Sequence, residues 1–572
     1  MRSWLSKAHL HHPLAVPVLL FAVIMAVYYP AMLSGVHSVD DPGIIALYTS
    51  CPPLSYILLP GNGYYYRPVL EFTYWLDNLL WGMEPSVMHL ENVLLHCANS
   101  LLVFLLARKV NGGATGRFPL IPMLAALLFA LHPVNVEAVS WLAGRSDPLL
   151  ALFVLSACLF WLRWLEGPRW QDFAAALVLF CTALLTKETA LAAGAVAFVL
   201  ALVWRGTATV RERTMAIVFL AAPSLLLVIV AVLFRRGTSS LSSFTSATDL
   251  KAGQGIWDAL TGFGFYARKL VVPAPLNFAI TEVHPIYGLL GVALLGSLFW
   301  LLLRHRITGA LLASAALMAL PAVLIAANQI AWTPFAERYL YLPSAFFALG
   351  LAASIRSGSN RLRGSVFAGV ILVLAGFAGI SLQRSMLWHD KLAFMQDAIS
   401  KSPGFGTLYN ELGGILLKDD ETERAADAFA TAERLNKRAS MHLLIKANLM
   451  GVEFAKGNYS GVRERFYQTF KEKKEAPADF LQLLQQADGR RMTSLSGQEK
   501  ILLAKDLLET LDLLNRKRYD PFWLYRSGQL SLSIGDEAKA AEFFSRSLKA
   551  APADAHYRKA TEIYLRKLGH TQ

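Results

Sequence analysis

Apolar residues along the first two thirds of the chain gather in runs separated by short polar stretches. Each run holds about 20 residues, which is enough for an α-helix to cross a lipid bilayer. The pattern predicts an all-α, polytopic membrane protein with about 11 transmembrane helices on this length criterion. The predicted helices centre on Leu20, Leu101, Leu127, Leu155, Val178, Val196, Leu225, Leu295, Leu317, Leu349 and Leu372.

The polar junctions between these runs differ in charge. If the N-terminus lies in the cytoplasm, the even-numbered junctions carry most of the Lys and Arg, including Arg108, Lys109, Arg211 and Arg213, with few acidic residues. Such a bias favours the cytoplasmic side. We therefore expect the first loop, and everything after Arg384, on the opposite, outer face.

Two of the outer loops are long. The first, residues 34–88, contains the aromatic stretch 64–66 and an amphipathic stretch at 70–81, which we expect to lie flat at the membrane interface. The second, residues 235–285, contains an apolar segment at 263–276 that is broken by charged residues and prolines. We interpret that segment as an interfacial or re-entrant helix.

Beyond residue 384 the composition becomes that of a soluble helical domain, so we divide the chain into domains 1–384 and 385–572. Gly413, Ala425 and Phe429 recur at the same spacing as Gly528, Ala540 and Phe544. This spacing matches the tetratricopeptide repeat, in which small residues let paired helices approach. We expect a solenoid of about three or four repeats. It would bind a peptide or serve as a packing or dimerisation domain.

Composition supports the membrane assignment. The chain has 572 residues, of which 55% are hydrophobic and 17% charged, and its mean hydropathy is +0.41. These values exclude an ordinary soluble protein of this length. The net charge of +13 fits cytoplasmic Lys and Arg better than nucleic-acid binding. The four cysteines form neither a disulfide framework nor a metal-binding spacing. We interpret the N-terminal apolar run as an uncleaved first span, because it is long for a signal peptide.

Charged residues at four outer turns are the candidates for chemistry. Charges bracketed so closely by apolar residues are costly unless they are paired or line a wet cavity. A pocket that holds both acidic and basic residues could bind an anionic lipid phosphate through its basic groups and remove a proton from a substrate through its acidic groups. The clusters are Asp40-Asp41, the stretch 132–147 with Glu137, Arg145 and Asp147, the pair Lys187-Glu188, and the pair Glu337-Arg338.

Each cluster has a purely structural alternative. An aspartate after a span is often a solvated helix cap. Lys187-Glu188 and Glu337-Arg338 could be local ion pairs, and Arg145 with Asp147 could pin a turn. Because His132 precedes a proline, we expect it at a helix end and not as a ligand. We expect the tyrosines at 64–66 to belong to the aromatic belt at the membrane interface, and not to a surface that stacks on a sugar. The joint occurrence of the clusters on one face favours a functional site.

Four strings in the chain resemble a known family. They are YYRPVLEFTYWLDNLLWGMEPSVMHLENVLLHCANSLL, ALHPVNVEAVSWLAGRSDPLLALF, LLTKETA and AERYLYLPS, in this order and followed by the repeat-like tail. They resemble the transmembrane and tetratricopeptide-repeat-containing family, whose animal members are O-mannosyltransferases of the endoplasmic reticulum. The family is similar to the GT-C glycosyltransferases, which take a sugar from a polyprenyl-phosphate carrier outside the cytoplasm.

The resemblance implies a role for each cluster. The catalytic base would be Asp40 or Asp41, because an acid of the first outer loop has that role in such enzymes. The base would remove the proton of an acceptor hydroxyl as it attacks the anomeric carbon, which inverts that centre. Arg145, Lys187 and Arg338 would neutralise the lipid phosphate. Orienting or sugar-binding roles fall to Arg67, Glu137, Asp147, Glu188 and Glu337. A divalent cation at the paired aspartates is a lower-ranked alternative, and we assign no certain cofactor.

The resemblance implies as partners a polyprenyl-phosphate-linked sugar, membrane lipids and a protein or glycan acceptor presented by the repeats. The short repeat array, the basic loops and the lack of an evident retention signal favour a bacterial member in the inner membrane, with its site and repeats in the periplasm. Neither the sugar nor the acceptor is fixed. The rival functions are a polymerase or ligase using a lipid diphosphate, a noncatalytic scaffold, and a transporter, which the clustering of polar groups at span ends disfavours.

Overall fold

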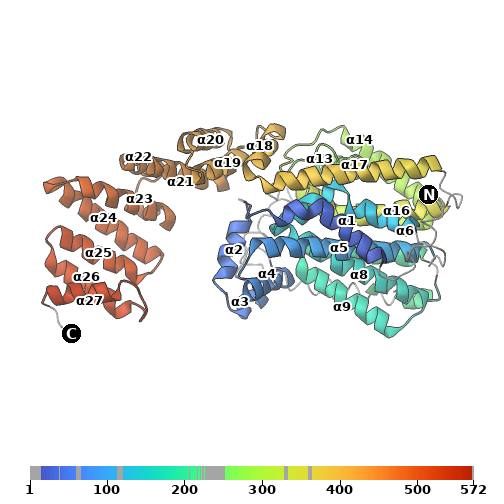
Figure 1. Ribbon diagram of the computed structural model, residues 1–572, viewed down its shortest axis with the longest axis horizontal. Helices are drawn as coiled ribbons and strands as arrows, with labels where there is room; N and C mark the ends of the chain where they lie inside the picture. Colours follow the sequence, from blue (N-terminus) through green and yellow to red (C-terminus); the bar gives the residue numbers. More distant parts are fainter. Residues whose placement is uncertain are drawn as a thin grey trace. The chain divides into compact units, whose positions relative to one another are not determined.

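The structure is a computed structural model that describes residues 15–37, 39–59, 66–112, 120–204, 206–214, 252–327, 333–357 and 364–569, together with residues 217, 218, 221 and 225 (Figure 1). Its secondary structure in these ranges is helical, apart from one isolated bridge between Ile280 and Phe335. The chain divides into two compact units, Met1–Ser402 and Pro403–Gln572. The boundary predicted at residue 384 falls inside helix α17, which ends at His389.

The first unit contains a bundle of long apolar helices. Seven helices in the described ranges are long and apolar enough to cross a membrane, and the number rises to eight if the bent pair Leu120–Ala130 and Pro133–Ser140 is one span. The seven candidate spans correspond to the helices α1 (Ala15–Met32), α5 (Pro85–Val110), α8 (Ser146–Glu166), α14 (Tyr287–Arg304), α15 (Arg306–Ala327), α16 (Tyr341–Ser357) and α17 (Gly364–His389).

The prediction of about 11 spans is therefore not confirmed. Helices α9 (Trp170–Thr186) and α10 (Leu191–Val203) lie where two spans were predicted, but they contain 17 and 13 residues. Both are shorter than the ~20 residues that a straight crossing requires. The span predicted around Leu225 lies outside the described residues, apart from isolated positions. The multi-pass character of the chain is confirmed by the seven long apolar helices.

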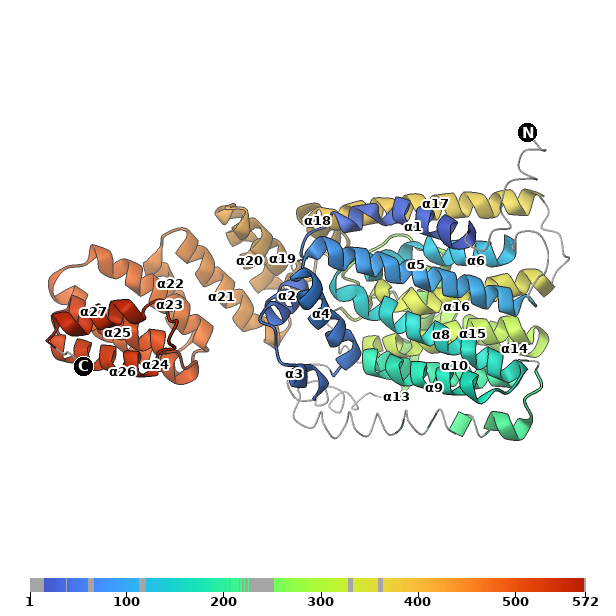
Figure 2. The same ribbon diagram turned by 60° about the horizontal axis from the view of Figure 1, so that its bottom comes forward.

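Figure 2 shows the short helices α2 (Asp41–Thr49) and α3 (Leu54–Leu58), and α4 (Pro68–Trp81), gathered at one end of the bundle. These helices contribute to a buried cluster with Leu142, in the turn before α8, and Leu149, in the first turn of α8. Their members of the cluster are Tyr48, Ile57, Leu70 and Tyr74. This cluster holds the first loop against the end of the bundle.

Helix α4 covers the predicted amphipathic stretch. Leu70, Tyr74 and Asp77 are buried, and their spacing of three to four residues places them on one helical face. The apolar side chains of Leu79 and Trp81 are exposed. The helix ends at Gly82, whose φ of +62° lies in the left-handed region that glycine adopts without steric cost. That α4 lies flat on a membrane stays a prediction.

Helix α13 (Ala252–Val271) contains most of the segment predicted to be interfacial or re-entrant. It packs against α14 through glycines: a Cβ on Gly264 would lie 1.9 Å from the Tyr287 carbonyl oxygen, and one on Gly291 would lie 2.1 Å from that of Leu260. Because the contact partners run in opposite order, the two helices are antiparallel. The structure thus places α13 alongside a candidate span, and its depth in a bilayer stays a prediction.

The second unit is a series of helices, each packed on the next. Its first pair is α19 (Gly406–Lys418) with α20 (Thr422–Leu435), and a later pair is α25 (Pro521–Ser533) with α26 (Glu537–Ala550). A Cβ on Gly413 would lie 2.7 Å from the Phe429 ring, and one on Gly528 would lie 2.7 Å from the Phe544 ring. The close glycine–phenylalanine contact is the one expected from the repeated spacing. The tetratricopeptide assignment itself stays a prediction.

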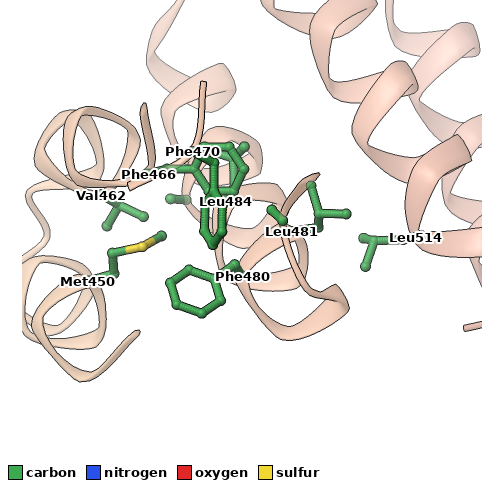
Figure 3. Close-up of a cluster of buried hydrophobic side chains, with 10 residues drawn as sticks. Met450, Val462, Phe466, Phe470, Phe480, Leu481, Leu484 and Leu514 are labelled. Atoms are coloured by element: carbon green, nitrogen blue, oxygen red, sulfur yellow. The ribbon is translucent and has the colours of Figure 1, made fainter. Parts of the chain in front are cut away.

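Between these pairs lie α21 (Ala439–Ala455), α22 (Tyr459–Thr469), α23 (Ala478–Arg491) and α24 (Gly497–Lys517), and α27 (Arg558–Lys567) follows the last pair. Figure 3 shows the apolar cluster that joins the middle helices, with Met450 from α21, Phe466 from α22, Leu484 from α23 and Leu514 from α24. These middle helices therefore share one buried core, although their sequence repeats are degenerate.

Candidate active site

The two aspartates of the first loop have different surroundings. Asp40 is exposed and precedes the first residue of α2, and its side chain makes no capping hydrogen bond there. Asp41 is fully buried. Its Oδ2 accepts a hydrogen bond from the His37 N–H at 2.8 Å, and its Oδ1 accepts one from the Ala143 N–H at 3.1 Å. Asp40 is thus free to meet a substrate, whereas Asp41 fastens the loop.

The charges around these carboxyls also differ. Burial raises the pKa of Asp41 to about 7, although its two backbone hydrogen bonds act in the opposite direction. Desolvation raises the pKa of Asp40 above its ordinary value, while the positive charges of Arg338 and Arg67 lower it. Both arginines therefore lie close enough to Asp40 to act on its charge, although they come from distant parts of the sequence.

Arg338 lies in the turn η5 (Glu337–Leu340) and is held from three sides. Its guanidinium carbon lies 5.2 Å from the centre of the Trp141 ring and 4.9 Å from that of Tyr339. Its Nη1 donates to the Glu137 carboxylate. The other oxygen of Glu137 accepts the backbone N–H groups of Glu337 and Arg338, at 3.0 and 3.1 Å. Glu137 thus caps the turn and fixes its arginine.

The third cluster lies where the chain breaks between α9 and α10. Lys187 ends α9, and Glu188 begins the short turn η3 (Glu188–Ala190). The Lys187 Nζ donates to Asp147 Oδ1 at 2.6 Å. Arg67 binds both oxygens of Glu188, through Nη2 at 2.5 Å and Nε at 3.0 Å. Each member of the sequential pair is therefore bound to a distant residue of opposite charge.

The Tyr339 ring joins the clusters. It lies against Arg338, and the Lys187 ammonium lies 5.7 Å from its centre. The second oxygen of Asp147 is buried and has no hydrogen-bond partner within the described part of the chain. The structure thus brings together most of the predicted site: Asp40, Arg67, Glu137, Asp147, Lys187, Glu188 and Arg338.

Arg145 is the exception, and its predicted role as a phosphate ligand conflicts with its place in the structure. Its side chain is 2% exposed and donates to Asp77 at 2.6 Å, to Glu91 at 2.8 Å and to Asn92 at 3.1 Å. Its guanidinium also lies 5.0 Å from the centre of the Tyr74 ring. Because α4 and α5 already satisfy its donors, Arg145 joins these helices to the turn before α8.

Two structural alternatives, the local ion pairs Lys187–Glu188 and Glu337–Arg338, are wrong. Glu188 binds Arg67, and Glu337 binds Lys269. The third alternative, that Arg145 pins the turn before α8, agrees with its contacts to α4 and α5, while Asp147 binds Lys187. His132, by contrast, lies near a helix end as expected: α6 (Leu120–Ala130) ends two residues before it, and it caps the turn η1 (Pro133–Asn135). Its Nε2 lies 2.9 Å from the Leu270 carbonyl oxygen.

Sequence reasoning missed three charged partners of the candidate residues: Asp77 and Glu91, which bind Arg145, and Lys269, which binds Glu337. Asp77 occupies the buried face of α4, where an acid among apolar residues signals a partner. Lys269 interrupts the apolar segment 263–276, and its position there does not indicate a partner. No comparable signal marks Glu91, whose partner lies 54 residues away.

Both oxygens of Asp41 accept backbone N–H groups, and a divalent cation at the paired aspartates stays a prediction. Across the described ranges, no three His, Cys, Asp or Glu side chains gather in a way that could hold a metal ion. The positive charge at the site is supplied by Arg and Lys side chains.

The chain is similar to known mannosyltransferases. Residues 67–234 match the family model "Dolichyl-phosphate-mannose-protein mannosyltransferase". A protein O-mannosyl-transferase of Drosophila melanogaster is 38% identical over 128 residues, which are 22% of this chain and 14% of the relative. One from Caenorhabditis elegans is 24% identical over 380 residues, or 65% of this chain and 54% of the relative. One from Mus musculus is 25% identical over 413 residues, or 64% and 44%.

These matches confirm the resemblance to protein O-mannosyl-transferases, although the chain spans at most about half the length of these relatives. A solved structure, ArnT from Cupriavidus metallidurans bound to undecaprenyl phosphate, aligns with a TM-score of 0.39 and 14% identity, over 97% of this chain and 85% of that one. A bacterial origin stays a prediction.

Proposed function

We propose that the chain is a membrane glycosyltransferase that moves a sugar from a polyprenyl-phosphate donor to a hydroxyl group of a protein or glycan on the outer face of the membrane. The observation that carries the proposal is the exposed carboxyl of Asp40, on which the positive charges of Arg338 and Arg67 act. One site thus offers a proton acceptor together with cations suited to a phosphate.

Asp40 is the base in this proposal. A Ser or Thr hydroxyl is a weak nucleophile at neutral pH, and a carboxylate within hydrogen-bond reach removes its proton as it attacks. A bond forms between the acceptor oxygen and the anomeric carbon while the bond from that carbon to the phosphate oxygen breaks. The proton goes to Asp40, and the electron pair leaves with the polyprenyl phosphate. Attack opposite the leaving group inverts the anomeric centre.

Arg338 and Lys187 stabilise the departing phosphate. The guanidinium of Arg338 contacts the Trp141 and Tyr339 rings and pairs with Glu137, which restricts its movement before substrate binds. Fixed donors aimed at developing negative charge lower the barrier without reorganising during the reaction. Lys187 acts as a point charge, and Arg67 with Glu188 completes the wall of the site. A divalent cation has no assigned role in this scheme.

The match to the mannosyltransferase family supports the proposal for only part of the site. It contains Arg67, Glu137, Asp147, Lys187 and Glu188, but it begins after Asp40 and ends before Arg338. The roles of those two residues rest on the geometry described above. The second unit has a separate role in the proposal, which is to bind the acceptor protein or glycan.

The proposal is tested with full-length protein in lipid nanodiscs supplied with a polyprenyl-phosphate-linked sugar and a hydroxyl acceptor. The acceptor and sugar are first identified by glycan mass spectrometry on a strain lacking the gene and on its parent. We expect transfer by the wild-type chain and about 10²- to 10⁴-fold less by Asp40→Asn. Unchanged glycans in the deletion strain, or full activity of Asp40→Asn, would contradict the proposal.

A further inference from the structure

A buried ion pair lies directly behind the candidate phosphate-binding turn. Lys269, near the end of α13, donates from Nζ to Glu337 Oε1 at 2.6 Å. Their side chains are 3% and 4% exposed. Glu337 precedes Arg338 in the chain, so the pair joins α13 to the turn that carries the guanidinium. Lys269 belongs neither to the predicted site nor to the segment that matches the mannosyltransferase family.

Further hydrogen bonds make this junction rigid. The Lys269 Nζ also donates to the Pro275 carbonyl oxygen, and the Glu337 Oε1 accepts the Asn277 N–H at 3.0 Å. The N–H of Phe335 donates to the Ile280 carbonyl oxygen at 3.3 Å. The segment around residue 337 is therefore bound on one side to α13 and to the loop after it.

Glu137 binds the same turn from the other side. It accepts the backbone N–H groups of Glu337 and Arg338 and pairs with the Arg338 guanidinium. Two buried carboxylates thus hold the turn, one from each side. Only one of them, Glu137, touches Arg338 itself. The other, Glu337, is joined to the guanidinium through the backbone that it shares with Arg338.

We propose that Lys269 is a positioning residue for lipid-phosphate binding: by anchoring Glu337 it sets the backbone of the turn and so the direction in which Arg338 presents its guanidinium. This inference rests on the proposed function, because it takes a polyprenyl phosphate as the ligand of Arg338. A shift of about 1 Å in a binding group can cost on the order of a hundredfold in rate. The position of Arg338 is therefore as important as its charge.

The choice of variants to test this role depends on the free energy of burying the Lys269–Glu337 ion pair. Removing Lys269 alone leaves Glu337 buried without its partner, which destabilises a protein strongly. Replacing both members with neutral residues of similar size is often neutral for stability. The test variant is therefore Lys269→Met with Glu337→Gln, because the glutamine oxygen still accepts the Asn277 N–H. Lys269→Arg keeps the charge and is the conservative variant.

The experiment measures binding of undecaprenyl phosphate, without sugar, to full-length protein in nanodiscs by native mass spectrometry. We expect the double variant to bind on the order of tenfold more weakly than wild type, with an unchanged melting temperature. Lys269→Arg should recover most of the affinity. In an Arg338→Ala background the same two changes should cause no further loss, because their effect acts through Arg338. Lys109→Met with Glu166→Gln, which neutralises the Lys109–Glu166 pair, is the control and should bind as wild type does.

The outcomes separate the inference from the proposed function. If Arg338→Ala binds weakly but the double variant binds as wild type does, Lys269 has no positioning role and the proposed function stands. An equal further loss in the Arg338→Ala background would also overturn the inference, because the effect would then be independent of Arg338. If wild-type protein does not bind the lipid phosphate, both fall.

Discussion

The Asp41 carboxylate accepts a hydrogen bond from the backbone N–H of Ala143 at 3.1 Å, which ties the first loop to the turn before α8. Asp41 is buried, whereas its neighbour Asp40 is exposed, and the positive charges of Arg338 and Arg67 act on its carboxyl. Two adjacent carboxyls thus serve different ends in our proposal: one accepts the substrate proton and the other fixes the loop.

This difference predicts separable effects of two matched variants. Asp40→Asn should lower sugar transfer by about 10²- to 10⁴-fold, the range for loss of a general base, with an unchanged melting temperature. Asp41→Asn replaces one acceptor with an amide NH₂ that faces a backbone N–H, so it should lower the melting temperature and reduce transfer less. Transfer assays and thermal unfolding on both proteins check this. The reverse pattern would assign the base to Asp41.

The pH profile should respond to Arg67. Its positive charge favours the ionised form of Asp40 and so lowers the pKa of that carboxyl, against the upward effect of desolvation. Neutralising the Arg67–Glu188 pair by Arg67→Met with Glu188→Gln should raise the pKa of Asp40. Since only the ionised carboxylate accepts a proton, the acid limb of kcat/KM should move to higher pH.

The matched control for this shift is Lys109→Met with Glu166→Gln, which neutralises a pair outside the candidate site. Its acid limb should coincide with that of wild type. An acid limb that stays in place in the Arg67–Glu188 variant, or moves to lower pH, would mean that Asp40 is not the group whose ionisation limits the rate.

Arg145 and Arg338 should behave oppositely. Arg145→Met leaves Asp77 and Glu91 without their cation, and loss of one partner of a buried pair costs about 3–5 kcal/mol of unfolding free energy. Arg338→Met should weaken donor binding strongly with a smaller loss of stability, because Glu137 still accepts two backbone N–H groups when the guanidinium is removed. Unfolding and lipid-phosphate binding are measured on both variants. A stable Arg145→Met protein that fails to bind the donor would restore Arg145 to the site.

The location of the site could be predicted from sequence, because helices that cross a bilayer in alternation bring every second turn to the same side. Asp40, Glu137, Lys187 and Arg338 each follow an apolar run at such a turn. The order of the apolar runs along the chain was therefore enough to predict that these four residues lie at the same end of the bundle. Two of the runs, α9 and α10, are shorter than expected, yet the turn between them still carries Lys187 to the site.

The pairing of the charges could not be predicted in this way. Lys187 and Glu188 are neighbours, but their partners lie 40 and 121 residues away. Which carboxylate a buried cation meets depends on the rotation and tilt of the packed helices, and these follow from side-chain packing rather than from periodicity. For the same reason, Arg145 could not be separated from Arg338 until Asp77 and Glu91 were found beside it.

The second unit provides a matched pair of adjacent glycines in α19. A Cβ on Gly413 would lie 2.7 Å from the Phe429 ring, whereas one on Gly414 would meet no atom within 4 Å. Replacing a helical glycine with alanine by itself stabilises a helix by up to about 1 kcal/mol, because glycine has more backbone entropy to lose. Overpacking a buried contact costs about 1–3 kcal/mol.

Gly414→Ala should therefore raise the stability of the second unit, and Gly413→Ala should lower it, because the fully buried Phe429 ring has little room to move. Hydrogen exchange of α19 and α20 in the full-length protein reads out this unit separately from the membrane helices. The same test applies to Gly528→Ala and Phe544. If Gly413→Ala and Gly414→Ala protect α19 equally, the glycine is not needed for close approach, and the repeat-like spacing loses its physical basis.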